Sequence, residues 1–325
     1  MKSIFRANLF ILLLVVFQIL SQLTIVGPLI DLMGYSKFLA LDEYLFLLIP
    51  VILYMAITKL SPKEVFRLNK LSFSDAFIVI VIAVFCQPIA SFLSYITAIF
   101  FSNPVSKAFH ELSSISLLSM LFMMAVTPAI CEEAVTRGVV LHGYNNKSIF
   151  KAALVNGLVF AILHLSPQQS LYAFALGFIF VYIVRITNSI FASMLCHFTF
   201  NSLQVTLSKL VITNTEASKA QGEAVTNQGG VQIIVTLIVL FAIAAVCGVV
   251  IYSLIKILES RHRTYPEQYT VNYQGDTDAI SNSSDARAYL YNGYDRKDDK
   301  AGVSTYVPLI LLTILYFGVM ILISR

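Results

Sequence analysis

The sequence has little charge. Of its 325 residues, 12% are charged and 58% are hydrophobic, whereas about 25% of the residues of a soluble domain are charged. The mean hydropathy of +0.79 agrees with this balance. The composition excludes an ordinary soluble domain and predicts an all-α protein that crosses a membrane many times.

Paired cysteines and clusters of basic residues are also missing. The four cysteines lie apart from one another inside apolar segments, so they indicate small core residues rather than a disulfide framework or a zinc knuckle. The net charge of +4 is small and the basic residues are scattered, which argues against binding to nucleic acid.

The apolar residues fall into nine runs of about 20 residues, the length that spans a bilayer. These runs are 7–30, 41–58, 74–101, 114–140, 149–165, 169–186, 188–206, 231–257 and 306–323. The first run is longer than the apolar core of a signal peptide and lacks a small-residue cleavage site, so we expect a retained transmembrane helix.

Two polar stretches interrupt this pattern. Residues 207–229 are predicted to form a flexible loop, and residues 258–305 an exposed, disordered insert. We therefore expect a membrane domain over 1–257 with a catalytic core at about 114–206, then the insert, then a last transmembrane helix within 306–325.

The loops between alternate runs differ in their content of Lys and Arg. One set holds more of these residues, and such loops usually face the cytoplasm. We therefore predict a multi-pass protein with a cytoplasmic N-terminus, in the plasma membrane of a prokaryote. The basic residues of the inner set are Lys2, Arg6, Lys59, Lys63, Arg67, Lys70, Lys147, Lys151, Arg185, Lys256, Arg261 and Arg263.

The fourth run contains ionisable residues, which are costly at membrane depth and usually mark a functional site. Glu133 and Arg137 are four residues apart, so they share a helical face and are expected to pair. Glu132 lies about 100° around the helix and stays outside that pair. Pro128, four residues earlier, is expected to bend the helix.

Two later runs contain histidines at a similar depth. His164 follows Phe160 by one turn, and His197 precedes Asn201 by one turn. At about 1.5 Å per residue, Glu132, His164 and His197 lie roughly 14–22 Å from the inner boundary, near the middle of the bilayer. We therefore expect them to share one site.

Two hydrolytic chemistries fit this set of residues. In the preferred one, which needs no cofactor, Glu132 and His164 activate a water while His197 and Asn201 stabilise an oxyanion. In the alternative, Glu132, His164 and His197 bind a divalent metal such as zinc, although the sequence has no HExxH motif. Non-enzymatic readings of these residues, such as a polar clamp between helices, also remain open.

The three motifs Glu132-Glu133-x-x-x-Arg137, Phe160-x-x-x-His164 and His197-x-x-x-Asn201 occur in order. Together they resemble the CPBP family of intramembrane endopeptidases, the CAAX-processing and bacteriocin-processing type also called Abi. The resemblance implies a core of about eight helices, with one extra helix at the C-terminus here. It also implies that Glu132, His164, His197 and Asn201 are catalytic and that Glu133, Arg137 and Phe160 support them.

The expected activity is hydrolysis of a peptide bond in a membrane-anchored protein or peptide, within the lipid bilayer. The alternative function is that of a non-enzymatic membrane adaptor or bacteriocin-immunity protein. The tyrosine-rich insert at 258–305 and the polar residues between helices motivate this alternative.

Overall fold

A computed structural model describes residues 2–101, 112, 114–213, 229–262 and 302–323. Every regular element in these ranges is a helix, and within them seven helices are long and apolar enough to cross a bilayer. The predicted all-α, multi-pass membrane fold is confirmed. In lipid a helix satisfies its own backbone hydrogen bonds, which is why long apolar runs adopt this form.

The N-terminal part contains α1 (Lys2–Thr24), α2 (Val26–Met33), α3 (Tyr35–Glu43), the π-helix η1 (Tyr44–Leu48), α4 (Ile49–Thr58), α5 (Pro62–Val65) and α6 (Phe73–Ala98). The segment with the paired glutamates follows as α8 (Leu117–Leu121), η2 (Phe122–Val126), α9 (Thr127–Glu133), η3 (Ala134–Val140) and α10 (Leu141–Gly143). The remaining elements are α11 (Ile149–Leu163), α12 (Pro167–Thr187), α13 (Ile190–Thr213), α15 (Gly230–His262), η7 (Val303–Tyr306) and α17 (Val307–Ile323).

All nine predicted runs are helical, but two of them differ from a simple span. Helix α11 has only 15 residues, and α13 is not among the helices that are both long and apolar enough to cross a bilayer. Helix α11 is apolar but short and ends next to His164, whereas α13 carries His197 and Asn201 of the candidate site among its apolar residues.

Two predicted boundaries were wrong. Helix α13 continues to Thr213, so the first residues of the expected 207–229 loop are helical. Lys209 there donates to the carbonyl oxygen of Ile115 at 2.9 Å, which gives this turn a tertiary contact. Helix α15 likewise continues to His262, so the expected 258–305 insert begins later; most of that insert lies outside the described residues.

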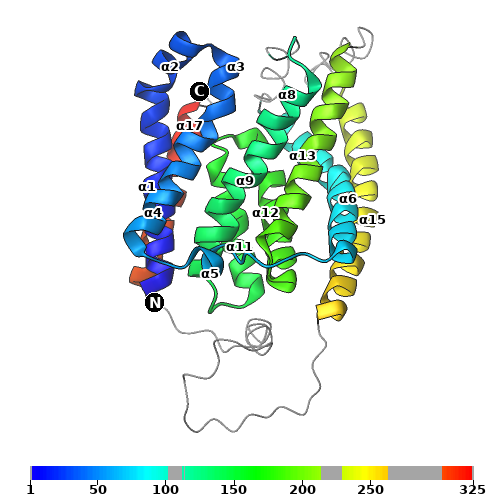
Figure 1. The fold of residues 1–325 in the computed structure, drawn as a ribbon. Helices are drawn as coiled ribbons and strands as arrows, with labels where there is room; N and C mark the ends of the chain where they lie inside the picture. Colours follow the sequence, from blue (N-terminus) through cyan, green and yellow to red (C-terminus); the bar gives the residue numbers. More distant parts are fainter. Residues whose placement is uncertain (1, 102–111, 113, 214–228, 263–301, 324–325) are drawn as a thin grey trace, which may run out of the picture.

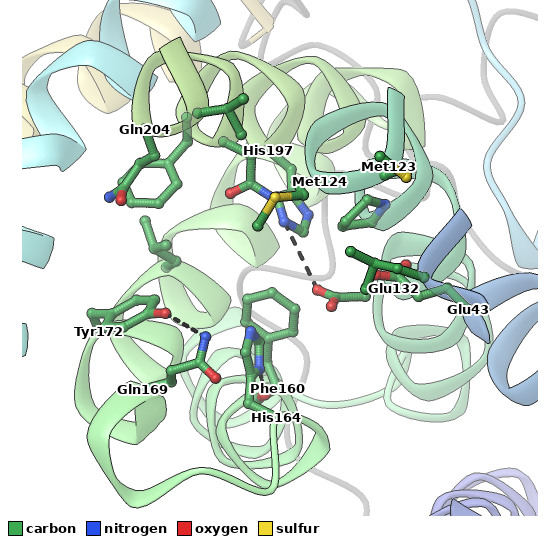
Figure 2. Close-up of a pocket in the computed structure, with 16 residues that line it drawn as sticks. Glu43, Met123, Met124, Glu132, Phe160, His164, Gln169, Tyr172, His197 and Gln204 are labelled. Carbon is green, nitrogen blue, oxygen red and sulfur yellow. Dashed lines mark hydrogen bonds and ion pairs between the residues drawn. The ribbon is translucent and has the colours of Figure 1, made fainter. Parts of the chain in front are cut away.

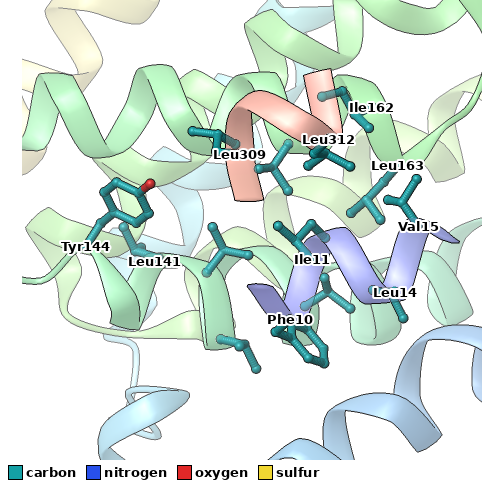
Figure 3. Packing of buried hydrophobic residues seen from close by; sticks show 14 of the residues in the cluster. Phe10, Ile11, Leu14, Val15, Leu141, Tyr144, Ile162, Leu163, Leu309 and Leu312 are labelled. Atoms are coloured by element: carbon teal, nitrogen blue, oxygen red, sulfur yellow. The ribbon is translucent and has the colours of Figure 1, made fainter. Parts of the chain in front are cut away.

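The helices form three groups (Figure 1). Helix α17 packs on α1 at one side, α15 packs on α6 at the other side, and α9, α11, α12 and α13 occupy the middle. Figure 3 shows how Ile11 and Leu14 of α1 lie beside Leu312 of α17 in one buried apolar cluster. The middle helices are therefore shielded from lipid on two sides.

Local sequence features explain several helix ends. Ser72 and Ser116 cap α6 and α8, since each hydroxyl oxygen accepts a hydrogen bond from a backbone N–H in the first turn. Pro167 opens α12, where its missing N–H is not needed. Asn188 ends α12 in the left-handed conformation, with φ of 50°.

Candidate active site

The fourth predicted run is a helix with two π-helical segments, η2 and η3, on either side of α9. π-Helical turns are rare and often mark functional sites. The first one lies just before Pro128, where the sequence predicted a bend. Glu132 and Glu133 end α9, and Arg137 lies in the second π-helical segment.

Glu133 and Arg137 form the expected pair. Arg137 Nη1 lies 3.0 Å from Glu133 Oε1, and neither side chain is exposed. The Arg137 guanidinium also lies 4.5 Å from the ring centre of Phe160 and 4.9 Å from that of Phe180. The charge of each partner is therefore compensated in a site that water does not reach.

His197 connects the two adjacent glutamates. Its Nδ1 lies 3.1 Å from Glu133 Oε1, and its Nε2 lies 3.8 Å from Glu132 Oε2. A carboxylate only accepts hydrogen bonds, so Nδ1 is the donor to Glu133. Glu133 therefore orients the imidazole as well as neutralising Arg137, a role that the sequence pattern did not reveal.

His164 has a fixed orientation of its own. Its Nδ1 lies 2.8 Å from the carbonyl oxygen of Phe160, which only accepts, so Nδ1 carries the proton there. The Phe160 ring meets the rings of His164 and His197 edge-on, with centroid distances of 4.9 and 5.7 Å. Phe160 thus spaces the two imidazoles and leaves Nε2 of His164 as the second ring nitrogen available for contacts.

Glu132, His164, His197 and Asn201 line one pocket of about 210 Å³ (Figure 2). The side chain of Glu132 is 15% exposed, in contrast to that of Glu133. The Oε2 atom of Glu132 has no hydrogen-bond partner among the described residues. The structure therefore brings the four predicted catalytic residues to one pocket, and for Glu132, His164 and His197 their common depth in the sequence predicted this meeting.

The pocket also contains residues that the sequence analysis missed, among them Glu43, Gln169, Tyr172 and Gln204. The sequence could have indicated Glu43 and Gln169 as site residues, because each is a polar residue within an apolar run. Tyr172 had no such indication, because a tyrosine in an apolar helix is most often a packing residue.

Arg67, in the loop before α6, contacts the segment with the paired glutamates from outside the pocket. Arg67 is buried, and its Nη1 donates to the carbonyl oxygen of Arg137 at 3.4 Å, while its Nη2 donates to the side chain of Asn145. Burial, and then the neighbouring charge of Arg185, lower the pKa of Arg67 to about 9. This contact ties the loop before α6 to the second π-helical segment.

The alternative metal set was Glu132, His164 and His197. Across the part of the chain that the structure describes, no three His, Cys, Asp or Glu side chains are grouped so that they could hold a metal ion. Glu132, His164 and His197 are therefore not grouped as a ligand set in this geometry.

The fold and the pocket define a helical, multi-pass membrane protein with two glutamates, two histidines and three amide side chains around one pocket inside the bundle. Residues 114–203 match the family model for type II CAAX prenyl endopeptidase Rce1-like proteins. This match confirms the resemblance to the CPBP family and supports a membrane protease of the CAAX type. No match is found among curated proteins or among solved structures.

Proposed function

We propose that this protein is an intramembrane endopeptidase that hydrolyses a peptide bond in a membrane-associated protein or peptide. One observation carries the proposal: four residues of the segment 114–203 line the same pocket. They are Glu132, His164, His197 and Asn201. We place the catalytic core within about 114–206, with the surrounding helices as its shield.

Glu132 is the general base in this proposal. Its unpartnered Oε2 can accept a proton from a water while the water oxygen attacks the carbonyl carbon of the substrate. His164 presents Nε2 as an acceptor, since its Nδ1 proton is engaged by Phe160, and so helps to orient the water. The pocket has ample room for this water, which needs only about 10–15 Å³.

His197 and Asn201 are the proposed donors to the carbonyl oxygen as it becomes negative. When protonated, His197 can donate from Nε2 while Glu133 holds Nδ1. The amide of Asn201 lies one helical turn further along α13. The proton on Glu132 then passes to the amide nitrogen, the C–N bond breaks, and a carboxylic acid and an amine form. The acid then gives its proton to the amine, so the products leave as a carboxylate and an ammonium group.

The test is cleavage of a panel of membrane-anchored peptides by purified protein in proteoliposomes. We expect Glu132→Gln to lower the rate by about 10²–10⁴-fold, the usual contribution of a general base. Glu64→Gln, which removes an exposed acid in an inner loop, is the matched control. Equal activity of the Glu132→Gln and wild-type proteins would remove Glu132 from the mechanism. Wild-type protein that cleaves no peptide, with a biological phenotype that survives Glu132→Gln, would instead support the adaptor function.

The metal-free route has a separate test. Elemental analysis of active protein should show no stoichiometric zinc, and a chelator should leave the rate unchanged. Zinc that is lost together with activity would overturn this route.

The proposal also places the N-terminus in the cytoplasm. In support, the N-terminus and α5 with its basic neighbours Lys63 and Arg67 lie at the same end of the bundle (Figure 1). A cysteine introduced at Lys63 should react with an impermeant thiol reagent only from the cytoplasmic side, and labelling from the other side would reverse the topology.

A further inference from the structure

Tyr172 and Gln169 line the pocket on α12, outside all three sequence motifs. In Figure 2 they lie across the pocket from Glu132, with Phe160 and His164 between the two walls. Gln169 Nε2 donates to the Tyr172 hydroxyl oxygen at 2.8 Å. The aromatic ring of Tyr172 also meets the imidazole of His164 at a centroid distance of 6.5 Å, close to perpendicular.

The bond from Gln169 decides what the phenol can still do. An amide nitrogen donates and does not accept, so the Tyr172 oxygen is the acceptor and its own proton is not used in this bond. Among the described residues, no acceptor for that proton is seen. A hydroxyl proton without a partner is costly in a low-dielectric site. The phenol is therefore oriented by Gln169 and ready to donate to a molecule in the pocket.

The position of Tyr172 suits the oxygen of the scissile carbonyl. Glu132 and Tyr172 line the same pocket from opposite walls, so a substrate carbonyl group held between these walls can face both side chains (Figure 2). When water attacks from the Glu132 side, the carbonyl oxygen gains negative charge and is pushed away from the carboxylate. The Tyr172 wall lies in that direction (Figure 2).

We propose that Tyr172 is a further catalytic residue, which donates its phenol hydrogen bond to the substrate's carbonyl oxygen together with His197 and Asn201. This inference rests on the proposed endopeptidase function. The phenol keeps its proton throughout, so the step needs no further reactant. Gln169 acts as a positioning residue, because it contacts the phenol oxygen and leaves the proton directed into the pocket.

The first experiment compares Tyr172→Phe with wild-type protein on a peptide that the wild type cleaves. The change removes one oxygen atom and keeps the ring that packs beside His164. We expect kcat to fall by about 10²–10³-fold, as for loss of one oxyanion donor, with KM nearly unchanged. Tyr252→Phe is the control, since it removes an exposed hydroxyl on α15, a helix that contributes no residue to the pocket, and it should keep the wild-type kcat.

A second variant tests the direction of the hydrogen bond. In Gln169→Glu the carboxylate can only accept hydrogen bonds. The Tyr172 hydroxyl would then donate to this carboxylate and could no longer donate to the substrate. We expect a fall in kcat close to that of Tyr172→Phe, and little further loss when the two changes are combined. Thermal unfolding of each variant in detergent shows whether the fold is kept.

The outcomes separate this inference from the function on which it rests. Cleavage that is abolished by Glu132→Gln but kept within about threefold by Tyr172→Phe would overturn the role of Tyr172 alone. A loss that appears in KM with kcat unchanged would make Tyr172 a binding residue and would also overturn it. Wild-type protein that cleaves no peptide would overturn both.

Discussion

The segment Leu117–Gly143, which carries the paired glutamates, and helix α15 (Gly230–His262) both span the membrane, but their surroundings differ. Over an 18-residue apolar window of each, 56% of the residues are buried in the first and 11% in the second. The buried segment contains Glu132, Glu133 and Arg137, whereas α15 keeps its charged residues near its C-terminal end. The helix that is shielded from lipid is thus the one that carries charge.

This difference follows from the solvent that each surface meets. A lipid-facing helix must be apolar because charged groups are poorly solvated by hydrocarbon. A helix inside the bundle can keep charged groups if they pair with each other and accept hydrogen bonds from neighbours. The comparison predicts that changes inside the bundle have large effects and that equivalent changes on α15 have small ones.

The largest expected effect on stability is at Arg137. Arg137→Met removes the cation that balances Glu133 in a fully buried site, although His197 still donates to the carboxylate, and breaking a buried pair in this way costs about 3–5 kcal/mol. We expect a large drop in the midpoint of thermal unfolding in detergent. The double variant Glu133→Gln, Arg137→Met should recover much of the loss, since glutamine is neutral and still offers His197 an acceptor oxygen. A double variant as unstable as the single one would show that the charge of Glu133 is not the cause.

The next effect concerns the contact between α11 and α12. A Cβ atom added at Gly157 would lie 2.8 Å from the backbone oxygen of Phe174 and 3.2 Å from its ring, so Gly157→Ala forces the two helices apart. Overpacking of this kind costs about 1–3 kcal/mol. We expect a lower unfolding temperature and reduced cleavage, because α11 carries His164 and α12 carries Tyr172. Unchanged stability would mean that this contact adapts more easily than a close-packed interior does.

The helices and the ion pair between Glu133 and Arg137 could be predicted from the sequence, because both depend on residues close together in the chain. Nine runs of apolar residues became helices, and the four-residue spacing of Glu133 and Arg137 placed them in contact. The common depth of Glu132, His164 and His197 predicted their meeting in one layer of the membrane, and they do line one pocket.

The rest of the site depends on how the helices are rotated and packed, which depth alone does not give. The spacing could not show that His197 lies between the two glutamates, nor that Tyr172 of α12 faces the same pocket. The π-helical segments η2 and η3 were also not predicted, since such segments have no clear sequence signature. Helix α15 extended beyond its apolar run because Arg261 and His262 both contact Asp75.

A smaller effect is expected where α15 is tied to α6 by charge. Arg261 Nε lies 2.8 Å from Asp75 Oδ1, but the Arg261 side chain is 40% exposed, so water competes for the pair. Asp75→Asn should lower stability by about 1 kcal/mol or less. The loss should shrink further in high salt, which screens exposed charges. A loss as large as that of Arg137→Met would show that α15 depends on this end contact more than its exposure indicates.

The smallest effect is expected at Gly248, in the middle of α15. A Cβ atom added there would meet no other atom within 4 Å, in contrast to Gly157. Gly248→Ala should therefore cause no loss of stability, since no neighbouring atom has to move and alanine favours a helix interior over glycine by about 0.5–1 kcal/mol. The measurement is the same thermal unfolding in detergent, repeated in lipid bilayers. If Gly248→Ala is harmless in detergent but costs as much as Gly157→Ala in a bilayer, another chain covers this face in the membrane, and α15 belongs with the buried helices after all.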